Sequence, residues 1–124
     1  MRKEEIDIAK VAKVEEIDGF TILVGRNAAM NDILTVKIAN PNDIWMHASG
    51  VPGSHVVIRV ESEIPNKEVI KKAAKLAAKN SKGKGKVNVV YTEAKNVKKS
   101  KGLNVGQVII TSSRSKTVKV FADD

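Results

Sequence analysis

The feature that most constrains the fold is an amphipathic helix predicted to begin at Lys67 and to end near Asn80. At about 100° per residue, five lysines fall within one arc of about 140°, and the apolar residues occupy the opposite side. The five are Lys67, Lys71, Lys72, Lys75 and Lys79. A helix with one apolar face must bury that face against a second layer of structure. We therefore expect the rest of the chain to form a sheet beneath this helix.

Short strands supply that sheet. Asp18-Gly19 between two apolar stretches predicts a β-hairpin, with strands at 11–17 and 20–24. The further predicted strands are 44–48, 55–60, 87–92, 108–111 and 117–121. These segments are short and rich in β-branched residues, which is typical of β-strands.

The segment 28–39 fits two structures. Its apolar spacing and the capping residue Asn27 favour a short helix, although the alternation at 35–38 also fits a strand. The overall expectation is an α+β fold. It has a mostly antiparallel sheet of about six to seven short strands, one long lysine-rich helix and one short helix.

Composition narrows the class of protein. A length of 124 residues fits one domain spanning 1–124. There are no cysteines, so disulfides and cysteine-based zinc sites are excluded. No apolar run approaches the roughly 20 residues that cross a bilayer, and the charged N-terminus does not resemble a secretory signal. We expect a cytoplasmic protein with no membrane partner, no metal and no cofactor.

Positive charge is concentrated in the second half of the chain. Residues 67–101 hold 12 lysines against two glutamates, a net of +10, although the whole chain carries only +8. The lysines after the helix lie in two loops. The first is an alternating lysine–glycine loop at 82–86, and the second is a basic loop at 95–101. These lysines are Lys82, Lys84, Lys86, Lys95, Lys98, Lys99 and Lys101. Such a field favours a polyanionic partner, and a lysine-rich solvated surface is the alternative.

The lysine–glycine loop is not a Walker A motif, because it lies between a helix and a strand instead of before a helix. Aromatic residues make up only 3% of the chain. Stacking on single-stranded bases is therefore limited to Trp45 and Tyr91. Phosphate contacts with structured RNA or duplex are favoured.

Both histidines lie near the tryptophan. Trp45 and His47 point to one side of a strand, and the Pro52-Gly53 turn can return His55 near His47. This cluster has three possible roles: catalysis or metal binding, hydrogen-bonded structure, or contact with RNA. Ser54 and His55 would face opposite sides of a strand, a poor geometry for a nucleophile pair. We favour a structural role and expect no enzymatic activity.

Six blocks of residues resemble the NFACT-R domain family, in the order found in that family. They are Gly25-Arg-Asn-x-x-x-Asn-Asp32-x-Leu-Thr, Asn42-Asp-Ile-Trp-Met-His47, Pro52-Gly-Ser-His-Val-Val-Ile58, Val87-Asn-Val-Val-Tyr-Thr92, Asn96-Val-Lys-Lys99 and Val105-Gly-Gln-Val108. The resemblance implies an RNA-binding domain of the RqcH- and NEMF-type ribosome quality-control proteins, which engage the large ribosomal subunit and tRNA. Those proteins have further domains that do not fit in 124 residues. The chain is thus expected to be a stand-alone or excised domain.

The expected function is binding of tRNA or ribosomal RNA, with DNA bound non-specifically, in ribosome-associated quality control or tRNA metabolism. The alternatives are a subunit in tRNA thiouridine modification and a protein adaptor on the ribosome. The expected nucleic-acid-binding residues are Arg26, Asn27, Trp45, His47, Ser54, His55, Lys67, Lys71, Lys72, Lys75, Lys79, Lys82, Lys84, Lys86, Lys98 and Lys99. The sequence does not indicate an oligomeric state.

Overall fold

The computed structural model describes residues 5–111 and 113–123. Six strands form the main sheet: β1 (Ala12–Ile17), β2 (Phe20–Gly25), β3 (Ile44–Ala48), β4 (Val56–Ile58), β5 (Lys86–Glu93) and β8 (Lys116–Phe121). Their spatial order is β1-β2-β4-β3-β5-β8, and every neighbouring pair is antiparallel. A second sheet pairs β6 (Val97–Lys98) with β7 (Ile109–Ile110). The helical elements are α1 (Ile8–Val11), α2 (Ala28–Ile33), the π-helix η2 (Leu34–Ile38), α3 (Lys67–Lys79) and the 3-10 turn η3 (Ala94–Asn96).

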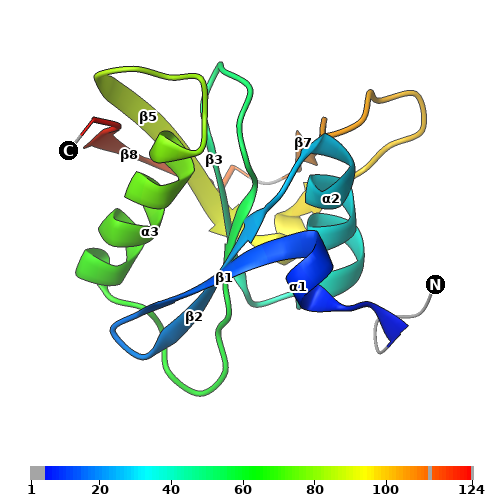
Figure 1. The fold of residues 1–124 in the computed structure, drawn as a ribbon, viewed down its shortest axis with the longest axis horizontal. Coiled ribbons are helices and arrows are strands. Elements are labelled where there is room, and N and C mark those ends of the chain that lie inside the picture. The colour runs from blue at the N-terminus through cyan, green and yellow to red at the C-terminus, as the bar shows by residue number, and fades with distance from the viewer. Residues whose placement is uncertain (1–4, 112, 124) are drawn as a thin grey trace.

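Different elements cover the two faces of the main sheet. Figure 1 shows α3 on one side of the sheet and α2 on the other. The apolar face of α3, including Val69, Ala73 and Ala77, packs on one set of strand residues. On the opposite face, Leu34 and Ile38 of η2 pack on the other set. The α+β architecture predicted from the sequence is confirmed, and the molecule has one core on each side of the sheet.

The predicted hairpin at Asp18-Gly19 is present. Both residues have positive φ, +49° and +87°, as a two-residue type I′ turn requires. The turn joins β1 to β2 in the register that pairs Ile17 with Phe20. One turn of helix, α1, precedes β1, so the strand begins at Ala12.

The chain is helical from 28 to 38, and the alternative strand at 35–38 is absent. The side chain of Asn27 accepts the N–H of Met30 at 2.9 Å and so caps α2. The helix then widens into η2 and ends where the N–H of Ala39 donates to Leu34 O at 2.8 Å.

The strand predicted at 55–60 is shorter than expected, because side chains take the backbone donors at both of its ends. The N–H of His55 donates to Asn31 Oδ1 at 3.1 Å. The N–H of Val60 donates to Asp43 Oδ1 at 2.9 Å. The regular strand is therefore Val56–Ile58, flanked by single backbone hydrogen bonds to β2 at His55 O and Arg59 N.

The predicted strand at 108–111 also differs. Only Ile109–Ile110 pairs, and it pairs with Val97–Lys98 in the small sheet instead of joining the main one. Within the described residues, no helix is long and apolar enough to cross a membrane.

Candidate nucleic-acid interface

The outer face of α3 is a lysine face, defined here as Lys67, Lys71, Lys72, Lys75 and Lys79. Asn66 caps the helix by accepting the N–H of Val69 at 3.0 Å, so the first turn starts in the predicted place. Four of the five lysines are exposed and Lys75 is half-buried. The amphipathic pattern is therefore realised, with one sign of charge facing outward.

One lysine of this face has a carboxylate partner from the β1–β2 turn. Lys72 Nζ lies 3.1 Å from Asp18 Oδ2, with both side chains about half exposed. An exposed pair of this kind contributes little stability. It does tie the middle of α3 to the hairpin, and it lowers the positive field at that point of the lysine face.

The lysine–glycine loop continues directly from α3. Lys82, Lys84 and Lys86 are all exposed. Lys86 Nζ lies 5.8 Å from the centre of the Phe121 ring, a cation–π distance. Lys82 and Lys84 therefore follow the C-terminal end of α3 directly, whereas Lys86 alternates with the buried Val87 and points to the other face of the sheet.

The Pro52-Gly53-Ser54 turn is fastened to the end of α3. Ser54 N–H donates to Asn80 O at 2.9 Å, and Lys82 N–H donates to Pro52 O at 2.8 Å. A Cβ at Gly53 would lie 2.6 Å from Ser81 Cβ, so only glycine fits. This motif positions the start of the basic loop.

The Trp-His cluster lies on the other face of the sheet from α3. The rings of His47 and His55 are 5.3 Å apart, so the turn does return one histidine to the other, as predicted. Trp45 stacks on His47 at 6.2 Å and meets His55 edge-on at 5.2 Å. Trp45 is only 2% exposed and His55 only 1%.

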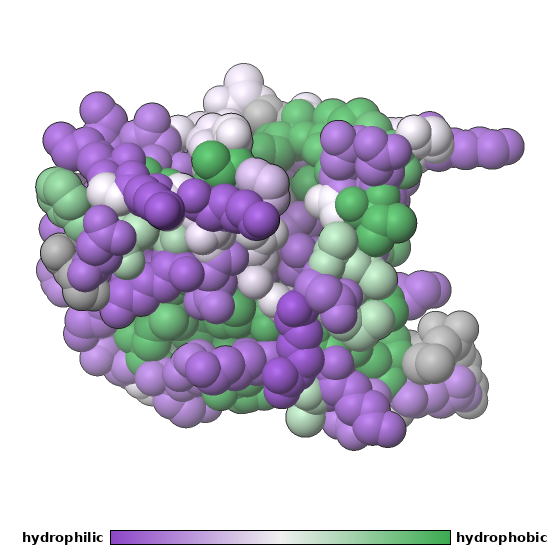
Figure 2. All heavy atoms as spheres, turned by 45° about the horizontal axis from the view of Figure 1, so that its top comes forward, coloured by the Kyte–Doolittle hydropathy of each residue, from purple (hydrophilic) through white to green (hydrophobic). Residues whose placement is uncertain are grey.

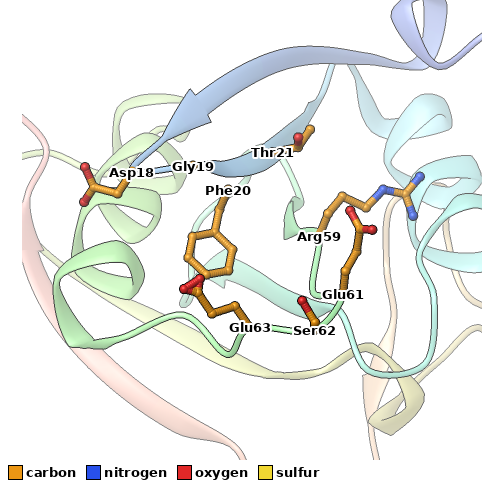
Figure 3. Close-up of a pocket in the computed structure, with 8 residues that line it drawn as sticks. All are labelled: Asp18, Gly19, Phe20, Thr21, Arg59, Glu61, Ser62 and Glu63. Atoms are coloured by element: carbon orange, nitrogen blue, oxygen red, sulfur yellow. The ribbon is translucent and has the colours of Figure 1, made fainter.

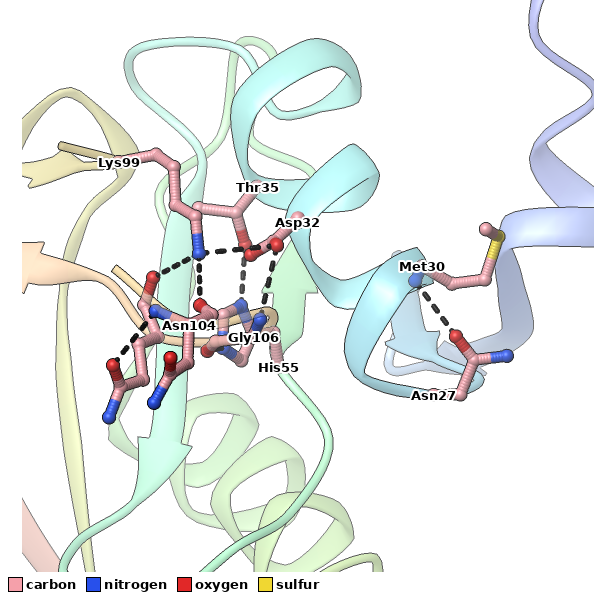
Figure 4. Close-up of polar contacts among 9 residues, drawn as sticks. Asn27, Met30, Asp32, Thr35, His55, Lys99, Asn104 and Gly106 are labelled. Carbon is pink, nitrogen blue, oxygen red and sulfur yellow. Dashed lines mark hydrogen bonds and ion pairs between the residues drawn. The ribbon is translucent and has the colours of Figure 1, made fainter. Parts of the chain in front are cut away.

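Hydrogen bonds close this cluster, and Figure 4 shows the contact between Thr35 and His55. Trp45 Nε1–H donates to Thr35 Oγ1 at 3.2 Å, and Thr35 Oγ1 lies 2.7 Å from His55 Nδ1. His55 Nε2 lies 3.1 Å from the carbonyl oxygen of Gly106. A carbonyl only accepts, so Nε2 carries the proton. Nδ1 of the neutral ring therefore accepts the Thr35 hydroxyl proton.

Burial keeps both rings neutral. Desolvation, reinforced by the neighbouring His47, lowers the pKa of His55 to about 4. Desolvation also lowers the pKa of His47, partly opposed by its hydrogen bond to the Gly53 backbone. Neither histidine supplies positive charge for a phosphate at neutral pH.

These contacts correct part of the predicted binding set. Trp45 and His55 are buried, so their side chains cannot stack on or touch RNA. The Ser54 hydroxyl donates to Gly25 O at 2.7 Å, whereas Nδ1 of His55 faces Thr35, so the two do not form a nucleophile pair.

Two further predicted residues serve the fold. Arg26 Nε donates to Ala9 O at 2.9 Å, and the side chain of Asn27 is engaged as the α2 cap. Both residues are nevertheless exposed.

Lys98 and Lys99 are separated from the lysine face, because β6 packs in the layer on the opposite side of the sheet. Lys98 is exposed, but Lys99 is a structural lysine. Its Nζ lies 3.3 Å from Asp32 Oδ2 and donates to Gln107 O at 2.8 Å and to Asn104 O (Figure 4). Gly106 N–H donates to the same Asp32 oxygen at 3.1 Å. Lys99 thus fastens the 99–107 loop to α2.

An acidic hollow marks the turn end of the β1–β2 hairpin (Figure 3). It has a volume of about 270 Å³, and Asp18, Glu61 and Glu63 line it with a single cation, Arg59. The close-up shows Phe20 beside Glu63 and the arginine beside Glu61. Carboxylates therefore outnumber cations in the lining at this end of the molecule. Throughout 5–111 and 113–123, no three His, Asp or Glu side chains are grouped to hold a metal ion.

Sequence reasoning missed two lysines of β8, Lys116 and Lys119, both exposed. The register pairs Lys116 with Tyr91 of β5, and β8 contacts α3. The sequence predicts a strand at 117–121, which contains Lys119, and assigns no role to either lysine. The neighbourhood of α3 depends on strand order, which the pattern does not reveal.

Residues 10–112 match the protein family described as the NFACT protein RNA binding domain. The chain is 43% identical over 111 residues to the Rqc2 homolog RqcH of Bacillus subtilis, covering 88% of this chain and 19% of that protein. It is 38% identical over 109 residues to mouse coiled-coil domain-containing protein 25, covering 82% of this chain and 50% of that protein.

A solved structure has the same fold. The C-terminal part of the fibronectin/fibrinogen-binding protein from Streptococcus suis superimposes with a TM-score of 0.78 at 38% identity. The match covers 97% of this chain and 49% of that one. The chain thus spans half, or less, of the length of these relatives.

Proposed function

Because the chain belongs to the family of NFACT protein RNA-binding domains, we propose that it grips RNA phosphates with the lysine face of α3 and the lysine–glycine loop. The RNA is tRNA or ribosomal RNA, and the setting is ribosome-associated quality control or tRNA metabolism in the cytoplasm. The domain acts by binding, without catalysis of its own.

The observation that carries this proposal is the single sign of charge along α3 and the loop after it. A solvated helix gains stability by alternating acidic and basic residues at i,i+4. On α3 only Glu68 is acidic, and it sits in the first turn, where the helix dipole favours it. Closely spaced like charges repel one another until an anion neutralises them, and a phosphate backbone does this with many contacts at once.

Two other regions of the molecule are less suited to a phosphate than this face. Carboxylates line the hollow at the hairpin end, and the Trp-His cluster on the far side is closed and uncharged. In Figure 2, hydrophilic residues cover much of the side where α3 and β8 lie, with hydrophobic residues showing between them. A phosphate backbone meets favourable potential over α3 and the 82–86 loop.

Contacts to phosphates position a nucleic acid without reading its bases. We therefore expect this face to bind tRNA, helical rRNA and duplex DNA, with preferences set by shape and the 2′-hydroxyl. Ribosomal partners of the longer relatives would supply the remaining specificity.

The test compares two variants with equal loss of charge. Lys71→Gln/Lys79→Gln removes two charges from the lysine face, and Lys10→Gln/Lys37→Gln removes two exposed charges from the other layer. Fluorescence anisotropy with labelled tRNA and a helical rRNA fragment measures Kd at about 50 mM salt. We expect the first variant to bind about tenfold more weakly and the second to stay within about twofold. Equal weakening by both variants would show a net-charge effect and contradict the assignment.

A further inference from the structure

A groove runs between α3 and β8, one of the two edge strands of the main sheet. Its volume is about 660 Å³, larger than the acidic hollow and within the range of ligand sites. Among the residues that line it, four are lysines and one is a glutamate. Lys67 and Lys71 line it from α3, and Lys116 lines it from β8. Lys119 borders it from the same strand, with its side chain alternating to the other face of the sheet.

The floor of this groove is apolar and contains an aromatic ring. Ile44, Tyr91 and Val118 line it and are all half-buried. Ile64 on the rim is 82% exposed, an unusual position for a large aliphatic side chain. Tyr91 and Lys116 are cross-strand partners and share one face of the sheet, so a cation stands directly beside the ring.

The groove continues past Tyr91 into a second hollow of about 250 Å³. Ile44, Tyr91 and Lys116 line both hollows. The second is also lined by Thr92, Glu93, Asn96 and Arg114. The ring thus lies where two consecutive hollows meet. This arrangement suits a chain-like ligand that passes over Tyr91, more than a single small molecule.

We propose that this groove binds an unpaired stretch of RNA, with one base against Tyr91 and the flanking phosphates on Lys71 and Lys116. The proposal rests on the RNA-binding function proposed above and specifies the part of the RNA that is bound. A duplex presents phosphates alone, which would leave the apolar floor and Tyr91 unused. An unpaired nucleotide presents a phosphate and an aromatic face together, matching cationic walls around an apolar floor.

Three labelled probes test the proposal by fluorescence anisotropy. The first is a blunt RNA hairpin, the second is the same hairpin with a single-stranded tail of about six nucleotides, and the third is a polyglutamate peptide of similar charge to the tail. The wild-type chain should bind the tailed hairpin about tenfold more tightly than the blunt one. It should bind the peptide more weakly than either RNA.

Two variants locate the tail. Tyr91→Leu keeps an apolar side chain for the core and removes the aromatic face, and it should abolish the advantage of the tail while leaving the blunt hairpin affinity unchanged. Lys116→Gln lies at an exposed position and should cost the tailed hairpin severalfold more affinity than the blunt one. Thermal unfolding of each variant verifies that it is folded. If Tyr91→Leu does not fold, Lys116→Gln alone still tests the proposal.

Three outcomes would overturn the groove assignment while leaving the proposed RNA binding intact. They are a tail that adds no affinity, variants that weaken both hairpins equally, and a peptide that competes as well as the tailed RNA. Failure of the proposed function looks different, because neither hairpin would then bind at low salt.

Discussion

The hydroxyl of Thr35 donates its proton to Nδ1 of His55 across 2.7 Å, and this bond joins η2 to the segment that enters β4. The same oxygen accepts the Nε1–H of Trp45 at 3.2 Å. One buried side chain therefore satisfies two ring nitrogens that have no access to water.

Replacing this hydroxyl tests the structural role of the Trp-His cluster. Thr35→Val keeps the shape but leaves the donor of Trp45 and the acceptor of His55 unpaired. We expect the free energy of unfolding to fall by about 2–3 kcal/mol in urea titrations. Thr117→Val, at an exposed position on β8, is the control and should change it by less than about 0.5 kcal/mol. An unchanged midpoint for Thr35→Val would show that the cluster contributes nothing to the fold.

Stability should depend on pH through the same cluster. His55 has a folded pKa of about 4 against an ordinary value of 6.5, so the unfolded chain binds more protons between these values. The folded state consequently loses stability as pH falls from 6.5 toward 4. Between pH 7 and pH 5 the loss from His55 is about 2 kcal/mol. His47 adds to it in the same direction, because its pKa is also lowered.

Urea unfolding at pH 7, 6 and 5 measures this dependence. His55→Gln supplies the comparison, because it removes the titrating group. Its free energy of unfolding should vary less with pH than that of the wild-type chain, even though the variant is less stable at pH 7. Stability that is level from pH 7 to pH 5 in the wild-type chain would contradict the buried, neutral assignment of His55.

Two adjacent lysines should behave differently. Lys99→Gln removes the charge that lies 3.3 Å from Asp32, a carboxylate whose other oxygen is buried and accepts no hydrogen bond within the described residues. We expect a loss of about 2 kcal/mol in stability and faster hydrogen exchange at the Gly106 amide. Lys98→Gln is the matched control, because Lys98 is the exposed neighbour of Lys99. It should change the free energy of unfolding by less than about 0.5 kcal/mol. Similar exchange rates in both variants would argue against a fastening role for Lys99.

The sequence predicted the elements whose signals are local. The helix at Lys67–Lys79 carries its period, its cap and its charge within one segment, and the Asp18-Gly19 turn needs only two residues. The pair of short strands β6 and β7 was not predicted as a sheet, because two-residue strands ten residues apart carry no period.

The candidate site was harder to predict, because burial is decided by distant segments. The alternation of its strand does not show whether the face that carries Trp45 is exposed. In the structure, η2 packs over that face and buries the ring. Lys98 and Lys99 are identical neighbours in sequence, and only a contact with Asp32 separates their roles. The lysine face was visible because its defining feature, one sign of charge along one helix face, is written within thirteen residues.

The most direct test of the central claim is the salt dependence of tRNA binding. For each chain, log K is plotted against log salt concentration, and the slope counts the phosphate contacts. We expect a linear fall for the wild-type chain, with a slope smaller by about 0.7–0.9 for each contacting lysine removed, and thus by about 1.4–1.8 in Lys71→Gln/Lys79→Gln. Lys10→Gln/Lys37→Gln should keep the wild-type slope. An unchanged slope in the α3 variant would contradict the claim that this lysine face binds RNA phosphates.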